Sequence, residues 1–279
     1  MSFSLPEGAK IGIFSPAGQP DEVRLARSMA LLEEWGYRPI RYPGPMNARG
    51  YLAGTDRERL DATVWALTDP DLAAAWLTRG GYGITRLLAA LPFEQLSPRP
   101  LLGFSDATAL LYPLYRRGWK QLVHGPVLHS LIDHAEAELM REFLKGHTPS
   151  FGGELVKPGR AEGPLVGGNL CVLNSLTGTP EQFEGRGAIL LLEDITEEPY
   201  RLDRYLTQMR HAGRLDGVAA IALGEFTECG GNPVDTVLAC LDWLDVPILT
   251  EVAVGHGKLN RPFVYGSQAR IDSQGLHLK

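Results

Sequence analysis

Apolar residues in the first half of the chain follow two alternating patterns. Short apolar runs, which are typical of buried strands, are each followed by a segment whose apolar residues recur every three or four positions, as in an amphipathic helix. The predicted strands are residues 10–14, 37–42, 72–77 and 100–104, and the predicted helices are residues 21–35, 56–67, 82–91 and 107–117. This alternation predicts an α/β fold with a doubly wound parallel sheet, in which ligands bind beyond the carboxyl ends of the strands.

The pattern changes in the second half of the chain. Between about residues 129 and 163 it weakens, and an acidic helical segment precedes a stretch rich in glycine and proline. We therefore interpret residues 136–163 as a linker between an N-terminal domain, residues 1–135, and a C-terminal domain, residues 164–279. The C-terminal domain is more mixed, with predicted strands at residues 188–192, 218–223, 248–254 and 263–271 and predicted helices at 170–176, 200–212 and 234–241.

Composition and charge exclude several classes of function. The 279 residues carry a formal net charge of −6, which does not favour nucleic acid as a partner. The N-terminus lacks the basic cluster and apolar run of a signal peptide, and no later segment is apolar enough to span a bilayer, so we expect a cytoplasmic protein without a membrane partner. The three cysteines form no C-x-x-C pair, which argues against a disulfide framework and against a cysteine zinc site.

Two turns near predicted strand ends do not match the nucleotide-binding motifs. The first strand leads into Ser15-Pro16-Ala17-Gly18 and not into G-x-G-x-x-G. The segment Arg79-Gly80-Gly81-Tyr82-Gly83 lacks the lysine and the Ser/Thr of a P-loop. Its glycines supply close backbone approach and free N–H groups, although a bare turn explains them nearly as well. We therefore expect no cofactor and no metal.

Ser105 lies where an apolar strand runs directly into a helical pattern. A serine at a sharp strand-to-helix turn projects its hydroxyl outward, and the first N–H groups of the following helix point toward an oxyanion that forms beside it. The alternative is that Ser105 or Asp106 only caps the helix that begins near Ala107. Ala107 also stands where the G-x-S-x-G elbow has its second glycine.

A serine nucleophile needs a base, most often a histidine that a carboxylate orients. Among the seven histidines, His256 stands at the end of a predicted strand between two glycines, although an exposed turn histidine explains this equally well. Glu193 and Asp194 follow a buried-type strand. Side chains alternate across a strand, so the two acids should face opposite ways, and the periodicity does not say which of them faces a site. Both can also be solvated acids, or one can pair with a nearby arginine.

Six blocks run in order across nearly the whole chain. They are Ser15-Pro16-Ala17, Arg79-Gly80-Gly81-Tyr82-Gly83, Gly103-Phe104-Ser105-Asp106, Gly167-Gly168-Asn169-Leu170, Leu192-Glu193-Asp194 with Glu198-Pro199-Tyr200-Arg201-Leu202-Asp203-Arg204, and Gly255-His256-Gly257 with Asn260. Together they resemble the LD-carboxypeptidase family, the serine peptidases called muramoyltetrapeptide carboxypeptidases, whose relatives include the microcin C7 self-immunity peptidases. One block would be weak evidence, whereas six in register are strong evidence.

The resemblance implies an N-terminal Rossmann-like or flavodoxin-like domain that carries the nucleophile and a C-terminal domain with β-barrel character that carries the acid and the base. It implies that Ser105 is the nucleophile, Glu193 the orienting acid and His256 the general base. It also implies that the backbone N–H groups of Gly81 and Asp106 form the oxyanion hole, which fits the helix-terminus geometry of the turn.

Side chains in or near the matching blocks are candidates for substrate contacts, and charged substrate ends need such partners. They are Arg79, Tyr82, Arg86, Asn169, Arg201 and Arg204. Each arginine could equally form an ion pair with another part of the protein. Family members are commonly homodimers, so the resemblance implies a homodimer.

The activity that the resemblance implies is hydrolysis of the L,D-peptide bond that releases the terminal D-alanine of murein tetrapeptides (L-Ala-D-Glu-diamino acid-D-Ala) in peptidoglycan recycling. The microcin-type relatives are longer and have an extra loop for a nucleotide-bearing substrate. The chain has no insertion that could supply this loop, which favours peptidoglycan recycling over self-immunity. Two further functions stay open: a serine esterase or acyl hydrolase that acts on small esters, and a non-catalytic module that only binds its ligand.

Overall fold

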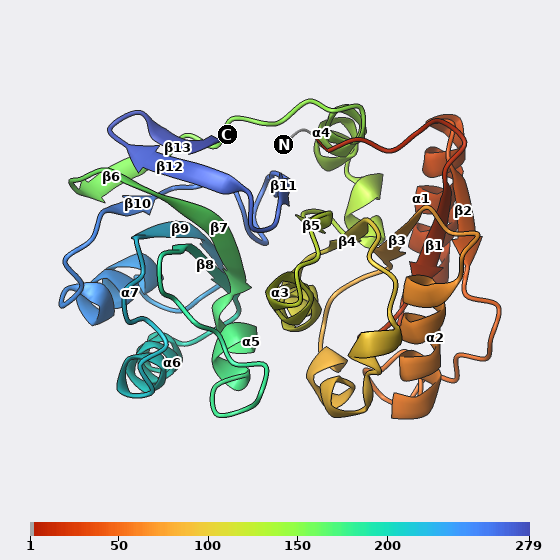
Figure 1. Ribbon diagram of the computed structural model, residues 1–279, viewed down its shortest axis with the longest axis horizontal. Coiled ribbons are helices and arrows are strands. Elements are labelled where there is room, and N and C mark those ends of the chain that lie inside the picture. Colours follow the sequence, from red (N-terminus) through yellow and green to blue (C-terminus); the bar gives the residue numbers. More distant parts are fainter. Residues whose placement is uncertain (1–2) are drawn as a thin grey trace. The chain divides into compact units, whose positions relative to one another are not determined.

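The apolar runs of the N-terminal half form a parallel sheet, as their pattern predicts. The structure is a computed structural model that describes residues 3–279. Five strands lie parallel in the order β2-β1-β3-β4-β5, which is the order of flavodoxin-like folds (Figure 1). They are β1 (Lys10–Phe14), β2 (Arg38–Arg41), β3 (Ala74–Leu77), β4 (Leu101–Gly103) and β5 (Leu122–His124).

Helices cover both faces of this sheet, which confirms the doubly wound prediction. On one face, Ile11 and Ile13 of β1 belong to an apolar core that includes Leu25 and Phe143 from two different helices. On the other face, a Cβ added to Gly12 would lie in ordinary contact with the ring of Trp65, at 3.5 Å, so the helix that carries Trp65 covers this face. The helices are α1 (Glu22–Glu34), α2 (Asp56–Thr68), α3 (Thr108–Arg116) and α4 (His134–Leu144), with short 3₁₀ turns η3 (Phe93–Gln95) and η5 (Leu128–Ile132).

The helix predicted at residues 82–91 is wrong. This segment forms two 3₁₀ turns instead, η1 (Ile84–Arg86) and η2 (Leu88–Ala90). Gly83 has a φ of +137°, which is incompatible with a helix, so helical structure begins only after it. The segment then ends at Leu91, because the residue before a proline avoids the helical conformation. The apolar spacing correctly indicates a buried face, which includes Ile84, Leu87 and Leu91, but the backbone forms 3₁₀ turns in place of an α-helix.

The second half of the chain forms a seven-stranded mixed sheet that is nearly closed into a barrel. Its strands lie in the order β13-β12-β7-β8-β9-β10-β6, with β7 to β10 parallel to one another (Figure 1). A bridge between Gly152, just before β6, and Leu276 of β13 links the two edges of the sheet. This closure confirms the barrel character that the family resemblance implies. The elements are β6 (Glu154–Lys157), β7 (Ala161–Asn169), α5 (Leu170–Ser175), β8 (Ile189–Ile195), α6 (Pro199–His211), β9 (Ala220–Thr227), α7 (Pro233–Leu241), β10 (Ile248–Thr250), β12 (Gln268–Asp272) and β13 (Gly275–Leu278).

Two predicted strands near the C-terminus are shorter than expected. The strand predicted at residues 248–254 ends at Thr250, because Glu251 adopts a left-handed φ of +57°. The strand predicted at residues 263–271 is two strands, because Gly266 turns the chain with a φ of +79°. The second of these is β12.

The first of these two strands, β11 (Phe263–Val264), pairs antiparallel with β5 at the edge of the N-terminal sheet. The described chain divides into two compact units, and β11 belongs to the N-terminal one although the segments on either side of Pro262–Val264 belong to the C-terminal one. The N-terminal unit comprises residues 3–149 with Pro262–Val264, and the C-terminal unit comprises Ser150–Arg261 with Tyr265–Lys279. Within residues 3–279, no helix combines the length and the apolar character needed to cross a membrane.

Candidate active site

Ser105 lies in a strained turn between β4 and α3. Its φ is +63°, in the left-handed region that non-glycine residues rarely adopt, and such a conformation costs of order 1–3 kcal/mol. In the described chain, neither the 3₁₀ turn η4 (Ser105–Ala107) nor α3 has a side-chain cap at its N-terminus. The alternative that Ser105 or Asp106 caps this helix is therefore wrong. Strain at a strand-to-helix turn is typical of a serine whose hydroxyl must be displayed.

A glycine-rich segment packs directly on Ser105. We call this segment, Arg79-Gly80-Gly81-Tyr82-Gly83, the glycine loop; it follows β3. A Cβ added to Gly80 would lie 2.7 Å from the Cβ of Ser105 and 2.9 Å from its Oγ, so only glycine permits this approach. The next residue, Gly81, has a φ of +110°. The N-terminal unit thus brings the glycine loop and the serine into contact.

Asp106 uses its carboxylate to hold the residue that follows the glycine loop. Its Oδ2 accepts a hydrogen bond from the backbone N–H of Ile84 at 2.9 Å. Burial raises the pKa of Asp106 to about 6, and the hydrogen bond from Ile84 and the charge of Arg59 oppose this shift. The carboxylate that follows the serine therefore ties the nucleophile turn to the glycine loop.

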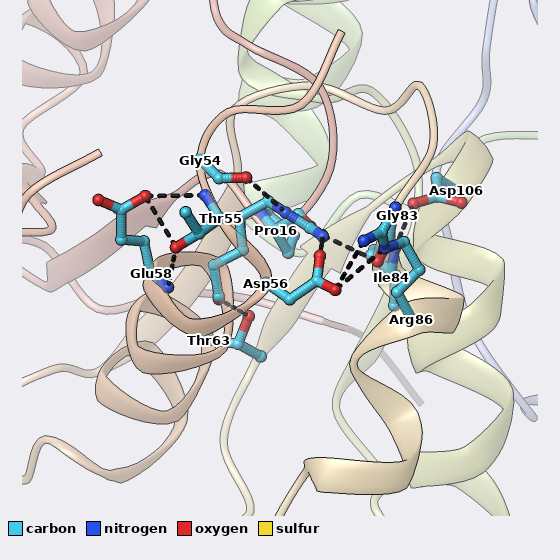
Figure 2. A network of polar contacts seen from close by, with 11 residues as sticks. Pro16, Gly54, Thr55, Asp56, Glu58, Thr63, Gly83, Ile84, Arg86 and Asp106 are labelled. Atoms are coloured by element: carbon cyan, nitrogen blue, oxygen red, sulfur yellow. Dashed lines mark hydrogen bonds and ion pairs between the residues drawn. The ribbon is translucent and has the colours of Figure 1, made fainter. Parts of the chain in front are cut away.

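Arg59 is a candidate site residue that lies outside the six sequence blocks. Its side chain is fully buried near the start of α2, and its guanidinium donates hydrogen bonds to three backbone carbonyl groups and to one carboxylate. Figure 2 labels these partners, which are Pro16, Gly54, Gly83 and Asp56. The helix buries Arg59 on the same face as Ala62, Thr63, Ala66 and Leu67. A charged residue on the buried stripe of an amphipathic helix was the signal that could have found it, because buried charges need dedicated partners.

In the C-terminal unit, β8 delivers Glu193 to His256. The Nδ1 atom of His256 lies 2.7 Å from Oε2 of Glu193, whose side chain is fully buried. A carboxylate only accepts hydrogen bonds, so this contact selects the tautomer with a proton on Nδ1. In the neutral ring Nε2 then keeps its lone pair and can accept a proton, which is the arrangement a general base requires.

Asp194 faces other partners, as strand alternation predicts for neighbouring residues. Its Oδ1 accepts from the side-chain amide of Asn169 at 2.8 Å, and its Oδ2 accepts from the backbone N–H of Cys171 at 2.9 Å. Burial raises the pKa of Asp194 to about 7, and the neighbouring charge of Glu193 adds to this shift. The structure therefore brings Glu193, and not Asp194, to the imidazole.

His256 lies in a loop after β10, not at a strand end, and Glu225 shapes this loop. A Cβ added to Gly257 would overlap the carboxylate of Glu225, and one added to Gly255 would lie 3.0 Å from the Cβ of Glu225. The loop is closed by Asn260, whose Oδ1 accepts from the N–H of Gly255 at 3.4 Å. His256 also lines a cavity of about 860 Å³ within this unit. Gly255, with a φ of +143°, is thus required by its backbone conformation, whereas a side chain at position 257 would have to displace the flexible end of Glu225.

The substrate-contact candidates in the N-terminal unit lie in or next to the glycine loop. Arg79 donates to the carbonyl group of Gln19 at 3.3 Å. Tyr82 is 46% exposed, and its ring centre lies 6.0 Å from that of Tyr51, so the pair forms an open aromatic surface. Arg86 forms an ion pair with Asp56 at 2.8 Å.

The candidates in the C-terminal unit all have contacts within that unit. Asn169 caps α5 by accepting from the N–H of Val172 at 3.0 Å. Arg201, in the first turn of α6, forms an ion pair at 3.6 Å with Glu197, which lies just before the helix. The guanidinium of Arg204 lies 5.2 Å from the ring centre of Tyr200. Their assignment to substrate stays a prediction.

Comparisons with known proteins match both halves of the chain. Residues 11–125 match the model of the LD-carboxypeptidase N-terminal domain, and residues 162–271 match that of the LD-carboxypeptidase C-terminal domain. An inferred carboxypeptidase of Synechocystis sp. is 40% identical, over 96% of this chain and 93% of that protein. The crystal structure of a muramoyltetrapeptide carboxypeptidase from Oxalobacter formigenes aligns with a TM-score of 0.84 and 30% identity, over 96% of this chain and 97% of that chain. The microcin C7 self-immunity protein aligns with a TM-score of 0.88 over 100% of this chain and 98% of that chain, but at 22% identity it shows only the same fold.

Proposed function

Since the chain belongs to the LD-carboxypeptidase family and is a hydrolase that acts on peptide bonds, we propose that it releases the terminal D-alanine of murein tetrapeptides by a serine mechanism. The observation that carries this proposal is the 2.7 Å contact between His256 Nδ1 and a fully buried Glu193. The general base of a serine peptidase needs a carboxylate that fixes its tautomer, whereas a histidine that only occupies an exposed turn does not.

In the proposed first step, Ser105 Oγ attacks the carbonyl carbon of the diamino acid, and His256 Nε2 accepts the hydroxyl proton. The carbonyl oxygen becomes an oxyanion that the N–H groups of Gly81 and Asp106 stabilise. Loss of one such donor in a comparable site costs about 2.7–4 kcal/mol of barrier. Glu193 stabilises the imidazolium that forms on His256.

The tetrahedral intermediate then collapses, and the bond between the carbonyl carbon and the alanine nitrogen breaks. His256 donates its proton to that nitrogen, so D-alanine leaves as a neutral amine and the tripeptide stays as an ester on Ser105. Water then attacks the carbonyl carbon of this ester, and His256 accepts a proton from the water. The C–O bond to Ser105 breaks, the serine recovers its proton, and the tripeptide leaves with a new carboxylate.

The biological setting that we propose is peptidoglycan recycling in the cytoplasm, with the enzyme acting as a homodimer. An acyl-enzyme mechanism needs no metal or cofactor, and the substrate is a small peptide. The candidates for the charged ends of that peptide are Arg79, Arg86, Arg201 and Arg204, because guanidinium groups bind carboxylates in a bidentate geometry.

The test is mass spectrometry of the purified protein with the tetrapeptide L-Ala-D-Glu-diamino acid-D-Ala and with its diastereomer that ends in L-alanine. We expect release of D-alanine from the first peptide and little cleavage of the second. Equal cleavage of both would contradict L,D specificity. Rapid turnover of aryl esters without cleavage of the tetrapeptide would support an esterase, and tight binding without release would support a binding module.

A further inference from the structure

The glycine loop is held at both of its ends. At its start, the carbonyl group of Gly80 accepts a hydrogen bond from the N–H of Gly18 at 3.1 Å. At its end, the carbonyl group of Gly83 accepts from Nη1 of Arg59 at 2.8 Å. Gly81, whose N–H is the proposed oxyanion donor, lies between these two anchors. The direction in which that N–H points therefore depends on them.

Arg59 connects the glycine loop to two other segments. The Nη1 atom that binds Gly83 also donates to the carbonyl group of Pro16 at 2.6 Å, and Nε donates to that of Gly54 at 3.3 Å. Nη2 forms an ion pair with Asp56 at 2.5 Å. A guanidinium presents its donors in a rigid plane, so partners on three segments are fixed relative to one another.

Gly83 is fitted to this guanidinium. Its φ of +137° is rarely adopted by residues with a side chain. A Cβ at this position would lie 2.6 Å from Nη1 of Arg59 and 2.9 Å from Cδ2 of Leu52. The end of the glycine loop and the buried arginine therefore form one packed arrangement.

A second ion pair extends this arrangement to the segment after the glycine loop. Arg86 in η1 donates to Oδ2 of Asp56 through Nε at 3.1 Å and through Nη2 at 2.8 Å (Figure 2). The hydrogen bonds from Arg86, and then those from Arg59, hold the pKa of Asp56 below its usual range. Asp56 therefore stays ionised at neutral pH and keeps both arginines in place.

We propose that Arg59 is a positioning residue for the oxyanion hole, because it sets the conformation of the glycine loop that presents the Gly81 N–H. The inference rests on the proposed function. Oxyanion donors interact most strongly with the transition state, so displacing one lowers kcat and leaves KM and substrate binding nearly unchanged. Replacing an arginine with a purely structural role would change the amount of folded protein and would not lower kcat selectively over KM.

The experiment compares Arg59→Lys with the wild type and with Arg57→Met. Lysine keeps the charge but is a point donor that cannot reach three carbonyl groups in one plane. We expect Arg59→Lys to lower kcat by about 10²-fold, the effect of a misplacement of about 1 Å in an active site, with KM changed less than about threefold. Arg57 lies on the same helix, is 80% exposed and pairs with Asp61, so Arg57→Met should keep wild-type kinetics.

A second measurement separates positioning from loss of structure. A phosphonate analogue of the tetrapeptide carries a tetrahedral anion, and we expect its affinity for Arg59→Lys to fall by the same factor as kcat/KM. Binding of the tetrapeptide itself, measured in a Ser105→Ala background, should not change. If Arg59→Lys does not fold, Asp56→Asn, which weakens the same arrangement from the surface, should show a smaller loss of kcat of the same type.

Two results would overturn the inference and leave the proposed function intact. The first is an Arg59→Lys variant that is as active as an active wild type. The second is an Arg59→Lys variant that loses equal affinity for the tetrapeptide and for the phosphonate. A wild type that binds but never cleaves the tetrapeptide would overturn the proposed function and the inference with it. The two failures are therefore distinguishable in one set of assays.

Discussion

The two units contribute to the proposed chemistry in different ways. In the N-terminal unit the functional geometry lies in the backbone, namely the left-handed φ of Ser105 and the positive φ values of Gly81 and Gly83. In the C-terminal unit it lies in one side-chain contact, the hydrogen bond between His256 and Glu193. The first depends on packing from many sides, whereas the second depends on two residues and the loop that holds one of them.

This difference predicts how strongly single substitutions affect activity in each unit. The acid–base contact fails when either side chain is replaced, because it consists of one hydrogen bond between two atoms. The backbone geometry of the nucleophile turn is distributed over Gly80, Asp106 and Arg59, so single changes there should have smaller effects. Substitutions in each unit test this ranking.

Apart from replacement of the nucleophile itself, the largest effect is expected for the base. His256→Ala removes the proton acceptor, so kcat for D-alanine release should fall by about 10⁴–10⁶-fold without loss of folding. His211→Ala is the matched control, because this histidine is exposed in the last turn of α6. Nearly unchanged turnover by His256→Ala in the D-alanine assay would remove the C-terminal unit from the mechanism.

The next effect distinguishes the two neighbouring acids. Glu193→Gln keeps the shape of the side chain but can stabilise the wrong imidazole tautomer, and a comparable change in a serine protease lowers kcat by about 10⁴-fold. Asp194→Asn is the same chemical change one residue along, and we expect a much smaller loss because Asp194 bonds to Asn169 and Cys171. Steady-state kinetics of both variants give the comparison. The reverse order of losses would show that Asp194 is the orienting acid.

Asp106 should give an effect on stability that depends on pH. Its pKa is raised from the usual 3.8 to about 6 in the folded protein, so folding disfavours its charged form. Its contribution to stability is therefore complete below about pH 4 and is lost as the pH rises through about 6. At 1.36 kcal/mol per pKa unit the loss approaches about 3 kcal/mol.

The measurement is urea unfolding of the wild type and Asp106→Asn at several pH values. The asparagine still accepts the hydrogen bond from Ile84 but never ionises. Relative to the wild type, the free energy of unfolding of the variant should rise by about 3 kcal/mol from pH 4 to pH 7. A difference that is constant with pH would show that the buried carboxyl does not titrate in this range.

The smallest effects are expected for two glycines, one from each unit. Gly80→Ala presses a methyl group against Ser105 in its strained turn, and we expect kcat to fall by about 10²-fold. Gly257→Ala meets the carboxylate of Glu225, which lies at the end of a flexible side chain and can move, so the loss should be smaller. Thermal unfolding measured beside the kinetics checks that both variants fold. A larger loss for Gly257→Ala than for Gly80→Ala would show that the Glu225 side chain does not move aside and would contradict the expected order of the two glycines.

The fold was largely predictable from the sequence because it depends on local patterns. The strand–helix alternation of the N-terminal half reports which residues are buried, and β1 to β4 form where short apolar runs predict them, whereas β5 was not among the predicted strands. The failures occur where backbone conformation overrides the apolar pattern. Gly83 delays the start of helical structure in the segment predicted as a helix at residues 82–91, and Glu251 shortens the predicted strand at residues 248–254.

The candidate site was only partly predictable. The positions of Ser105, Glu193 and His256 beside strands and glycines were visible, and the family resemblance supplied their roles. The strain at Ser105 and the contacts of Arg59 were not visible, because they join segments far apart along the chain. The only local sign of Arg59 was a charge on the buried face of α2.

The central claim is that Ser105 is the nucleophile of an L,D-carboxypeptidase. Its most direct test is mass spectrometry of the L-Ala-D-Glu-diamino acid-D-Ala tetrapeptide after incubation with the wild type and with Ser105→Ala. We expect the wild type to yield the tripeptide and free D-alanine, and Ser105→Ala, folded and still able to bind the peptide, to be slower by about 10⁶-fold. D-alanine release by Ser105→Ala at the wild-type rate would contradict the claim.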